Sequence, residues 1–554
     1  LPDIYGDKVV QIASCFNLYG ETKIKKHLLT ISNDVNNLEK NYLEDDEIEI
    51  VRCESETELL NIWLNLILSE NPDIITGYNI YNFDGQYIFD RCIELGLTNK
   101  RPNEEYKYYH GIRGKTFNRT NKISKLSQNY GLIKTKLIDS IGRIQLDIFK
   151  YVQKAYGGLS SYKLDDVSAE FITGKIIEVD ENDKHKIKLS NVEGLHIGNY
   201  IQIKIHNRFD VEDYYQGGKK KFEILDINDK TLTLNTKIEL NNTNIESLSW
   251  CLGKDDIKPI DIFNAFRENG TEKDKLKIGK YCVMDTVLCL ELMNKLKIIS
   301  NIMSMANVCY CPMKYIILRG EGIKTLSLVS KKCQENNFVL PTLIVNEDDN
   351  ADYEGAIVLP PKTGLYLKEP VSVLDYTSLY PSSMISKNLS HETFINIDKF
   401  LDEKNVYLKD EKEKINRAEI ELNKIGFESF TRINYENAEE GKYVRRIKID
   451  EEGKKEYLFV QNGKKGIIPT ILTELMSLRK ITKKEMKQFK KFSFEYDLLD
   501  SKQLAYKLTA NSIYGQMGSK YSQVFKKEIA ESTTAVGREQ LKIARDFVKV
   551  PSNY

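Results

Sequence analysis

The spacing of apolar residues changes several times along this chain, and each change predicts a different kind of element. Over residues 1–300, short apolar runs such as Ile74–Tyr78 alternate with stretches of helical spacing. This pattern is typical of strands alternating with helices in an α/β domain. Farther along, Val371–Leu374 carries two valines and a leucine, and we expect a buried strand there.

Between residues 172 and 252 the apolar and polar positions alternate strictly over short distances. Turns rich in Asn, Asp and Gly separate the alternating segments, and this combination predicts antiparallel strands. We therefore expect a small β-barrel or sandwich inserted into the first domain. The alternating segments are Lys175–Val179, Tyr200–Ile205, Phe222–Leu225 and Thr231–Leu234.

Helical spacing and strong helix formers dominate residues 471–488. Arg479 and Lys483 lie four residues apart in this stretch, so both project from one face of the predicted helix. Lys507 and Asn511 repeat the spacing in the next predicted helix. Basic residues spaced in this way usually belong to a solvated helix face, so the spacing alone predicts only a cationic surface.

Two longer strings carry more information than the spacing. Residues 375–382 read DYTSLYPS and residues 507–515 read KLTANSIYG. A single Asp after a strand is more often a cap or turn residue, and a single Lys-x-x-x-Asn is usually solvent-facing. The two full strings in this order resemble motifs A and B of the family B DNA polymerases. The resemblance implies template-directed addition of deoxynucleotides to a primer.

The first string implies the metal and sugar contacts of the nucleotide site. In the family, carboxylates hold two Mg²⁺ ions that neutralise charge on the triphosphate. Asp375 matches the motif A metal ligand, and Tyr376 stands where a backbone carbonyl also meets the metal. Tyr380 matches the aromatic residue that packs under the sugar and rejects a 2′-hydroxyl by a clash. Ser378 and Leu379, between them, are expected to line the nucleotide site.

The basic helices resemble the fingers of the family. Arg479, Lys483 and Lys507 would form a cationic cradle for the triphosphate, with Asn511 one turn beyond Lys507. Arginine can bind phosphate oxygens as a fork, whereas lysine acts as a point charge.

Two further short segments resemble family contacts to DNA. Tyr353–Ala356, which reads YEGA, is similar to the segment that contacts the template strand, so Tyr353 and Gly355 are expected DNA contacts. Tyr514 and Gly515 of the second string are expected beside the nascent base pair, where glycine permits close approach of the backbone.

A second set of carboxylates lies upstream. Residues 79–84 read NIYNFD and residues 281–285 read YCVMD, and the latter is expected to open a helix running to about Leu296. The two strings resemble the second and third motifs of the family's 3′–5′ proofreading exonuclease. Asp84 and Asp285 would then be metal ligands, and Tyr281 would orient the attacking water. Asp147 would either approach the metals or serve a structural role.

Two family motifs are not found in the chain. The first exonuclease motif supplies an Asp and a Glu, and the chain instead opens on a segment, Leu1–Val10, that resembles the sequence just after it. Motif C, the second source of palm carboxylate, and the thumb are also not found. We therefore expect the chain alone to be inactive at both sites. It would be part of a longer protein, one half of a split polymerase, or the product of an interrupted gene.

Composition adds bounds on partners. The 81 basic and 81 acidic residues cancel, so a DNA-binding protein of this kind must segregate its charge. The nine cysteines are scattered without a Cys-x-x-Cys pair, which is typical of reduced thiols in an intracellular protein. No apolar run approaches the roughly twenty residues of a membrane span. Primer–template DNA and dNTPs are the expected partners, together with a missing palm–thumb segment and a sliding clamp.

The resulting prediction is a multidomain α/β chain, similar to the delta-like polymerases of large eukaryotic DNA viruses. It comprises a ribonuclease-H-like exonuclease domain with a β-rich insert, an α+β palm and helical fingers, without a thumb.

We expect Mg²⁺ at both active sites and an intracellular location, with nucleus, cytoplasm and viral factory as alternatives. A catalytically inactive replisome scaffold and an exonuclease-only protein are the rival functions. The insert would bind DNA or a replication partner, or be passive. The expected domains are 1–300, with the insert at 172–252, then 301–465, 466–520 and 521–554.

Overall fold

The computed structural model describes most of the chain, and its contacts divide it into two compact units. The first unit is Leu1–Ile299 and the second is Ser300–Tyr554. The structure describes residues 5–21, 23–32, 48–97, 107–108, 117–127, 131–140, 142–207, 212–218, 220–239, 245–253, 257, 259–267, 270–340, 353–361, 363–368, 370–424, 444–450, 455–461, 463–491 and 493–549. Two of the expected sequence features, the opening residues 1–4 and the closing residues 551–554, lie outside these ranges.

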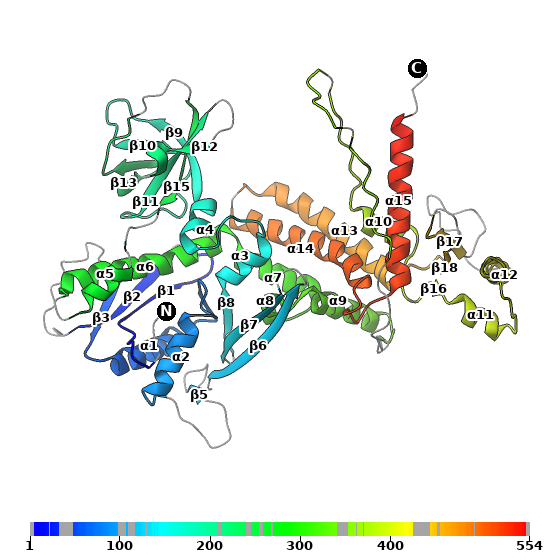
Figure 1. Ribbon diagram of the computed structural model, residues 1–554, viewed down its shortest axis with the longest axis horizontal. Helices are drawn as coiled ribbons and strands as arrows, with labels where there is room; N and C mark the ends of the chain where they lie inside the picture. The colour runs from blue at the N-terminus through cyan, green and yellow to red at the C-terminus, as the bar shows by residue number, and fades with distance from the viewer. Residues whose placement is uncertain are drawn as a thin grey trace. The chain divides into compact units, whose positions relative to one another are not determined.

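The first unit is built on a small mixed sheet covered on both faces by helices (Figure 1). Strand β1 pairs antiparallel with β2, and β2 pairs parallel with β3. Successive residues of a strand point to opposite faces. Leu29 therefore packs with α1 and α2, while Leu28 packs against Val283 and Val287 of α6. The elements are β1 (Gln11–Asn17), β2 (Ile24–Ile31), β3 (Ile48–Cys53), α1 (Glu56–Glu70), α2 (Asp84–Glu94) and α6 (Glu272–Lys295).

Helix α6 begins earlier than the sequence predicts. The YCVMD string was expected to open the helix, but α6 starts at Glu272 and ends at Lys295. The Thr271 hydroxyl oxygen accepts a hydrogen bond from the Asp274 amide, and the Asp274 carboxylate accepts one from the Thr271 amide. This capping box satisfies backbone donors at the helix start, so residues 272–280 join the helix. Consequently Tyr281 and Asp285 lie in its middle, where tertiary packing holds them more firmly than at an end.

A second, shorter sheet positions the connection into α2. Strand β4 (Ile74–Gly77) pairs parallel with β8 (Ile144–Asp147), and α3 (Ile148–Ala155) follows β8 directly. The antiparallel strands β5 (Lys107–Tyr108), β6 (Phe117–Ser127) and β7 (Gly131–Ser140) lie between them in sequence. Helix α4 (Leu164–Phe171) leads into the insert, and α5 (Pro259–Ala265) lies between the insert and α6.

The insert is a closed barrel, which settles the choice between barrel and sandwich. Its strands are hydrogen-bonded in the order β12-β11-β13-β14-β10-β9-β15, and β15 also pairs with β11. The sheet therefore closes on itself, with β12 attached to the outside of β11. Trp250 and Phe222 are fully buried inside it. The strands are β9 (Thr173–Val179), β10 (Lys186–Leu189), β11 (Tyr200–Asn207), β12 (Glu212–Tyr214), β13 (Phe222–Asn228), β14 (Thr231–Leu234) and β15 (Ile245–Gly253), with a 3₁₀ turn, Tyr215–Gly218, after β12.

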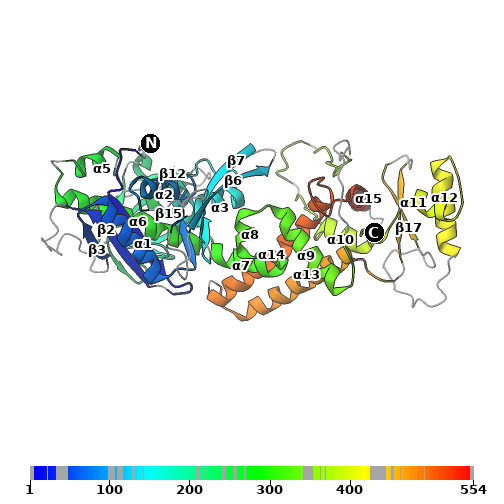
Figure 2. The same cartoon turned by 90° about the horizontal axis from the view of Figure 1, so that it is seen from below.

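The second unit is mainly helical. Helices α13 and α14 run alongside each other, and α9 packs on both of them (Figure 2). Helix α15 is buried continuously from Ile529 to Arg538 and packs on α10 and α14. The helices are α7 (Ile298–Cys309), α8 (Met313–Leu318), α9 (Glu321–Glu335), α10 (Leu379–Ser386), α13 (Ile467–Glu485), which a 3₁₀ turn extends over Met486–Gln488, α14 (Phe494–Met517) and α15 (Lys527–Lys549).

A small sheet with two helices completes the described part of this unit. Strand β18 lies between β16 and β17, and α12 packs on β17 and β18 through Ile415, Ala418 and Leu422. The elements are β16 (Phe394–Ile395), α11 (Ile397–Glu403), α12 (Glu411–Lys424), β17 (Val444–Lys448) and β18 (Glu456–Val460).

The predicted buried strand at Val371–Leu374 is wrong. These residues form no strand, and Val371, Val373 and Leu374 are 68%, 87% and 70% exposed. A strand needs a neighbour for its backbone donors and acceptors, and no described strand pairs with this segment. The apolar sequence that suggested burial is therefore an exposed strip in this structure.

No helix in the described part of the chain is both long enough and apolar enough to cross a bilayer. This agrees with the absence of a long apolar run in the sequence.

A buried ion pair joins α1 to α2 and yields a stability prediction. Arg91 donates through Nε to Glu56 Oε1 at 2.8 Å, and both side chains are about 95% buried. We expect Arg91→Met to lower the free energy of opening of the first unit by about 3–5 kcal/mol, because Glu56 is left as an uncompensated buried charge. Hydrogen exchange of α1 and α2 amides measures this change.

The exposed Lys25–Glu70 pair of the same unit provides the control. Lys25→Met should cost less than about 1 kcal/mol, because solvent screens exposed pairs. Equal effects of the two substitutions would contradict the assignment of Glu56–Arg91 as a structural pair.

Candidate functional site

The predicted nuclease carboxylates come from two different helices of the first unit. Asp84 is the first residue of α2, and Asp285 lies in the middle of α6. Burial raises the pKa of two thiols of α6, Cys282 and Cys289, and the charges of Asp285 and Asp84 raise it further by smaller amounts. The pKa of Cys282 reaches about 11. Asp285 lies on α6 between these two cysteines, and the Asp84 charge acts on the same stretch of the helix.

Asp147 has a structural role in this site. Its Oδ1 accepts hydrogen bonds from the Asn79 amide at 2.8 Å and the Phe149 amide at 3.0 Å. Its Oδ2 accepts one from the Tyr81 amide at 3.2 Å. Burial raises the pKa of Asp147, while these backbone bonds oppose the rise. Both oxygens are thus used to hold the turn that leads from β4 to Asp84, so the structure favours the structural alternative.

The turn before Asp84 needs this support because its backbone is irregular. Asn79 has φ of 63°, in the left-handed region, which Asn adopts more readily than most residues. A Cβ at Gly77 would stand only 2.5 Å from Ile80 Cγ2, so the chain folds back closely on itself. Desolvation by the surrounding protein and the charge of Asp147 raise the pKa of Asp84, although the residue still reaches solvent.

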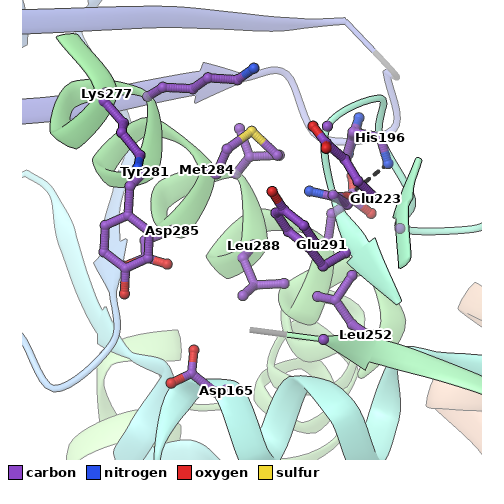
Figure 3. A pocket seen from close by; sticks show the side chains of 17 residues that line it. Asp165, His196, Glu223, Leu252, Lys277, Tyr281, Met284, Asp285, Leu288 and Glu291 are labelled. Carbon is purple, nitrogen blue, oxygen red and sulfur yellow. Dashed lines mark hydrogen bonds and ion pairs between the residues drawn. The ribbon is translucent and has the colours of Figure 1, made fainter. Parts of the chain in front are cut away.

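Tyr281 and Asp285 lie one helical turn apart and line one side of a cavity. Lys277 precedes Tyr281 by another turn, so the three side chains form a stripe along α6. Figure 3 shows the stripe on one side of the cavity, with Asp165 of α4 below it. The other side belongs to the barrel insert. Sequence reasoning assigned no role to Lys277 or Asp165.

The donors of the nuclease site fit Mg²⁺ in type. Asp84 and Asp285 offer carboxylate oxygens, and Mg²⁺ commonly binds through one or two carboxylates while keeping several waters. Among the described residues, no group of three or more His, Cys, Asp or Glu side chains is arranged to hold a metal ion. The pair could therefore hold an ion only together with water, substrate or further ligands.

The predicted polymerase residues begin in exposed coil and enter α10. Asp375 is exposed and makes no hydrogen bond or ion pair with the described residues. The hydroxyl of Tyr376 donates to the Gln540 carbonyl of α15 at 3.0 Å. Ser378 caps α10 with φ of 52°, and Leu379 starts the helix. This left-handed residue turns the chain sharply between Asp375 and Tyr380.

Three sequence-distant aromatic residues meet in the second unit. The rings of Tyr380 and Tyr514 lie 4.4 Å apart between centroids, at an interplanar angle of 36°. The hydroxyls of Tyr353 and Tyr514 are 3.1 Å apart, within hydrogen-bonding distance. A Cβ at Gly518 would stand 2.2 Å from the Tyr353 hydroxyl oxygen. Glycine at 518 thus allows Tyr353 to reach α14, and all three predicted motifs converge on Tyr514.

Arg538 holds the Tyr353 segment in place. Its guanidinium donates to the carbonyls of Glu354 at 3.0 Å, Gly355 at 2.9 Å and Ile449 at 2.7 Å. Gly355 is exposed, as is Gly515 on α14, and no atom lies within 4 Å of a Cβ built at either position. Sequence reasoning assigned no individual role to Arg538, although the run 532–540 that contains it resembles a palm helix of the family.

The predicted cationic helices pack together as expected, but only one of their cations is fixed. Arg479 donates through Nε to Gln503 Oε1 at 3.2 Å, joining α13 to α14. Lys507 and Asn511 follow Gln503 at four-residue intervals, so they share its face of α14. Lys483, Lys507 and Asn511 are exposed and make no hydrogen bond or ion pair with the described residues. No described contact joins these helices to Asp375.

Comparisons with known proteins agree on one family. Residues 311–553 match the model of DNA polymerase family B, and residues 1–167 match that of the DNA polymerase family B exonuclease domain. The DNA polymerase of Pyramimonas orientalis virus is 34% identical over 100% of this chain and 44% of its own length. The DNA polymerase delta catalytic subunit of Candida albicans is 27% identical over 99% of this chain and 40% of its own length.

The solved structure of the family B DNA polymerase from Pyrobaculum calidifontis has a similar fold. It superimposes with a TM-score of 0.53 at 19% identity, over 100% of this chain and 49% of that one. At this identity the likeness concerns the fold. The chain spans about half the length of the relatives it matches.

The hydrogen bonds of Asp147 generate a prediction about the nuclease site. We expect Asp147→Asn to lower the free energy of opening of the 77–84 turn by about 1–3 kcal/mol, because an amide group cannot accept from all three backbone N–H groups. Hydrogen exchange at Asn79, Tyr81 and Phe149 measures the loss.

Asp180 is a matched control, because it accepts from the Asn182 and Asp183 amides in an exposed turn. Asp180→Asn should change protection in the 77–84 turn by no measurable amount. Unchanged exchange in Asp147→Asn would show that the turn does not depend on this carboxylate.

Proposed function

The chain belongs to the family B DNA polymerases, and on that premise we propose that it is part of a replicative DNA polymerase with an associated 3′–5′ exonuclease. The complete protein adds deoxynucleotides to a primer under the direction of a template. The observation that carries the proposal is the meeting of Tyr353, Tyr380 and Tyr514 in one unit. These residues belong to three motifs spread over about 160 residues of sequence. A fold unrelated to the family would have no reason to bring the three motifs together.

In the proposed nucleotide site, the fingers helices bind the triphosphate. Arg479 is pre-positioned by Gln503, and Lys507 lies one turn along the same face as Gln503. Lys483 and Asn511 extend this polar surface. Their charges offset the phosphate charges that repel the attacking oxygen, which is the main requirement of phosphoryl transfer. Lysines without protein partners lose no existing ion pair when they bind phosphate.

The residues around Asp375 complete that site. Asp375 and the Tyr376 carbonyl would hold Mg²⁺, with Ser378 and Leu379 lining the pocket. The ion, when bound, neutralises phosphate charge and favours ionisation of the primer hydroxyl. Tyr380 packs on Tyr514, so its ring cannot move aside freely. A ribose 2′-hydroxyl would clash with such a fixed ring, which gives selection for deoxynucleotides.

In the proposed nuclease site, Asp84 and Asp285 would hold Mg²⁺ and Tyr281 would orient the attacking water. Tyr281 lies one turn before Asp285 on a rigid helix, so the water and the ion would have fixed relative positions. Asp147 contributes indirectly, by holding the turn that carries Asp84. Desolvation raises the pKa of Asp84, and a cation bound nearby would oppose this rise by favouring the ionised carboxylate.

The DNA and the remaining protein would occupy two exposed surfaces. Tyr353, Gly355, Tyr514 and Gly515 would face primer–template DNA, mainly through its backbone, so binding should weaken with salt and vary little with sequence. The apolar strip at 371–374 would pair with the rest of the palm, since an exposed apolar strip favours burial against a partner. A sliding clamp remains an expected partner of the complete enzyme.

Primer extension tests the polymerase proposal. We expect no extension by this chain alone, and extension after addition of a polypeptide that supplies the remaining palm and thumb. Asp375→Ala should reduce the restored rate by about a thousandfold or more, because a metal ligand supports several kcal/mol of charge stabilisation. Asp402→Ala, an exposed acid of α11, serves as the control and should leave the rate unchanged. Full activity of the Asp375 variant would refute the assignment.

A metal titration tests the nuclease proposal without requiring activity. Mg²⁺ at about a hundred times its Kd should stabilise the first unit by about 2.7 kcal/mol, measured by hydrogen exchange. Asp84→Asn should abolish this response, because it removes an anionic ligand. Asp90→Asn, on another face of α2, should retain it. A Mg²⁺ response that survives in Asp84→Asn would remove Asp84 from the metal site.

A further inference from the structure

The barrel insert is attached to the helix that carries the predicted nuclease residues. His196 Nε2 lies 3.3 Å from Glu291 Oε1, and Lys295 Nζ lies 3.1 Å from Glu193 Oε2. Both pairs join the loop Glu193–Asn199, which we call the docking loop, to α6. The insert is therefore held on α6 at defined points rather than by its two chain connections alone.

Glycines let the docking loop approach α6 closely. Gly194 and Gly198 have φ of 78° and 86°, a conformation that other residues rarely adopt. A Cβ at Gly194 would stand 3.7 Å from Glu291 Oε2, and one at Gly198 would stand 3.4 Å from Lys280 Nζ. The contacts thus extend along α6 from Lys280 to Lys295, about four turns, and Asp285 lies between them.

The docking loop has a shape fixed by its own hydrogen bonds. Asn199 Oδ1 accepts from the His196 amide at 2.8 Å, and the Asn199 amide donates to the His196 carbonyl at 3.0 Å. The Gly198 amide donates to the Ile224 carbonyl of β13 at 2.8 Å. A loop held in this way can act as a preformed wall, because little conformational entropy is left to lose on binding.

Between the insert and α6 lies a cavity of about 250 Å³, and about half of its lining residues come from the insert. Figure 3 shows Lys277, Tyr281 and Asp285 on one side, facing His196, Glu223 and Leu252 across the opening. Met284 and Leu288 contribute an apolar floor from α6. Cationic, apolar and hydrogen-bonding groups all line the cavity: Lys277 and Lys280, then the apolar Met284, Leu288 and Leu252, and the polar or acidic His196, Asn199 and Glu223.

A nucleotide presents partners for all three kinds of group. Its phosphate carries negative charge, its base has apolar faces, and the base edge carries donors and acceptors. Sites that read an unpaired base commonly pack its faces against apolar side chains and bond its edge. Two of the predicted catalytic residues, Tyr281 and Asp285, line the cavity, so the bound nucleotide would be the one next to the reacting phosphate.

We propose that the barrel insert forms the outer wall of a subsite that binds the terminal nucleotide of a single DNA strand at the nuclease site. The insert is then a positioning element: the docking loop presents His196 and Asn199 to the base, while α6 carries Tyr281 and Asp285, the residues proposed to act on the phosphate. This inference rests on the proposed exonuclease function, and it assigns a binding role to a segment that the sequence left open between DNA binding, partner binding and a passive insertion.

Binding of two oligonucleotides to the full chain and to its variants tests the proposal. We would measure the Kd of a single-stranded oligonucleotide ending in a normal 3′ nucleotide and of one ending in an abasic nucleotide, without divalent metal. The normal strand should bind about five- to a hundredfold more tightly, the range seen when one base loses its stacking contact. His196→Ala should remove most of this difference, because it deletes part of the wall and its bond to Glu291.

His206→Ala is the matched control. His206 also belongs to the insert and lies 2.7 Å from Ser249 Oγ, but it does not line the cavity. The difference between the two strands should persist in this variant. If His196→Ala and His206→Ala both keep the full difference, the insert does not form the wall and the proposal is overturned.

A photoreactive nucleotide at the 3′ end separates failure of this inference from failure of the nuclease function. The proposal predicts adducts both on the α6 segment that contains Tyr281 and on the docking loop. Adducts on α6 without any on the insert would overturn the wall while supporting the nuclease site. Adducts on neither, or no binding of any strand, would overturn the proposed nuclease function and this inference with it.

Discussion

Irregular backbone next to a predicted site residue must have its polar groups satisfied, and in each unit one buried charged side chain does this. Asp147 accepts from the amides of Asn79, Tyr81 and Phe149. Arg538 donates to the carbonyls of Glu354, Gly355 and Ile449. Unpaired backbone groups in such places would cost free energy comparable to a lost hydrogen bond each. The charged side chain is thus the element on which the positions of Asp84 and Tyr353 depend.

This arrangement assigns different tasks to different residues. Asp84, Asp285 and Asp375 carry the proposed chemistry and remain accessible to it, whereas Asp147 and Arg538 are buried and act through the backbone. The division has a physical reason, because a carboxylate that already accepts hydrogen bonds from three amides has little capacity left for a metal ion. In the first unit α6 supplies a rigid support for Tyr281 and Asp285, and in the second unit α14 supplies one for Tyr514.

The sequence predicts the family and the local elements well, but it predicts contacts between distant parts of the chain poorly. The strings around Asp375 and Lys507 identify the family, and strict alternation predicts the β-rich insert. Alternation cannot say which strand edges join, so closure through β11 and β15 came only from the structure. The start of α6 was missed because the Thr271–Asp274 capping box lies outside the recognised string. The strand at 371–374 was wrong because strand formation depends on a partner, which a local pattern does not report. The role of Arg538 depends on carbonyls more than 180 residues away.

We propose that one nucleotide site is formed by the segments that carry Asp375, Tyr380 and Tyr353 together with the cations of α13 and α14. An experimental structure of the chain with primer–template DNA, Mg²⁺, an unreactive dNTP analogue and the palm–thumb polypeptide proposed above tests it most directly. We expect the triphosphate to lie beside Arg479 and Lys507, the sugar over Tyr380 and the ion at Asp375. An analogue bound elsewhere, with Asp375 and these cations on separate surfaces, would contradict it.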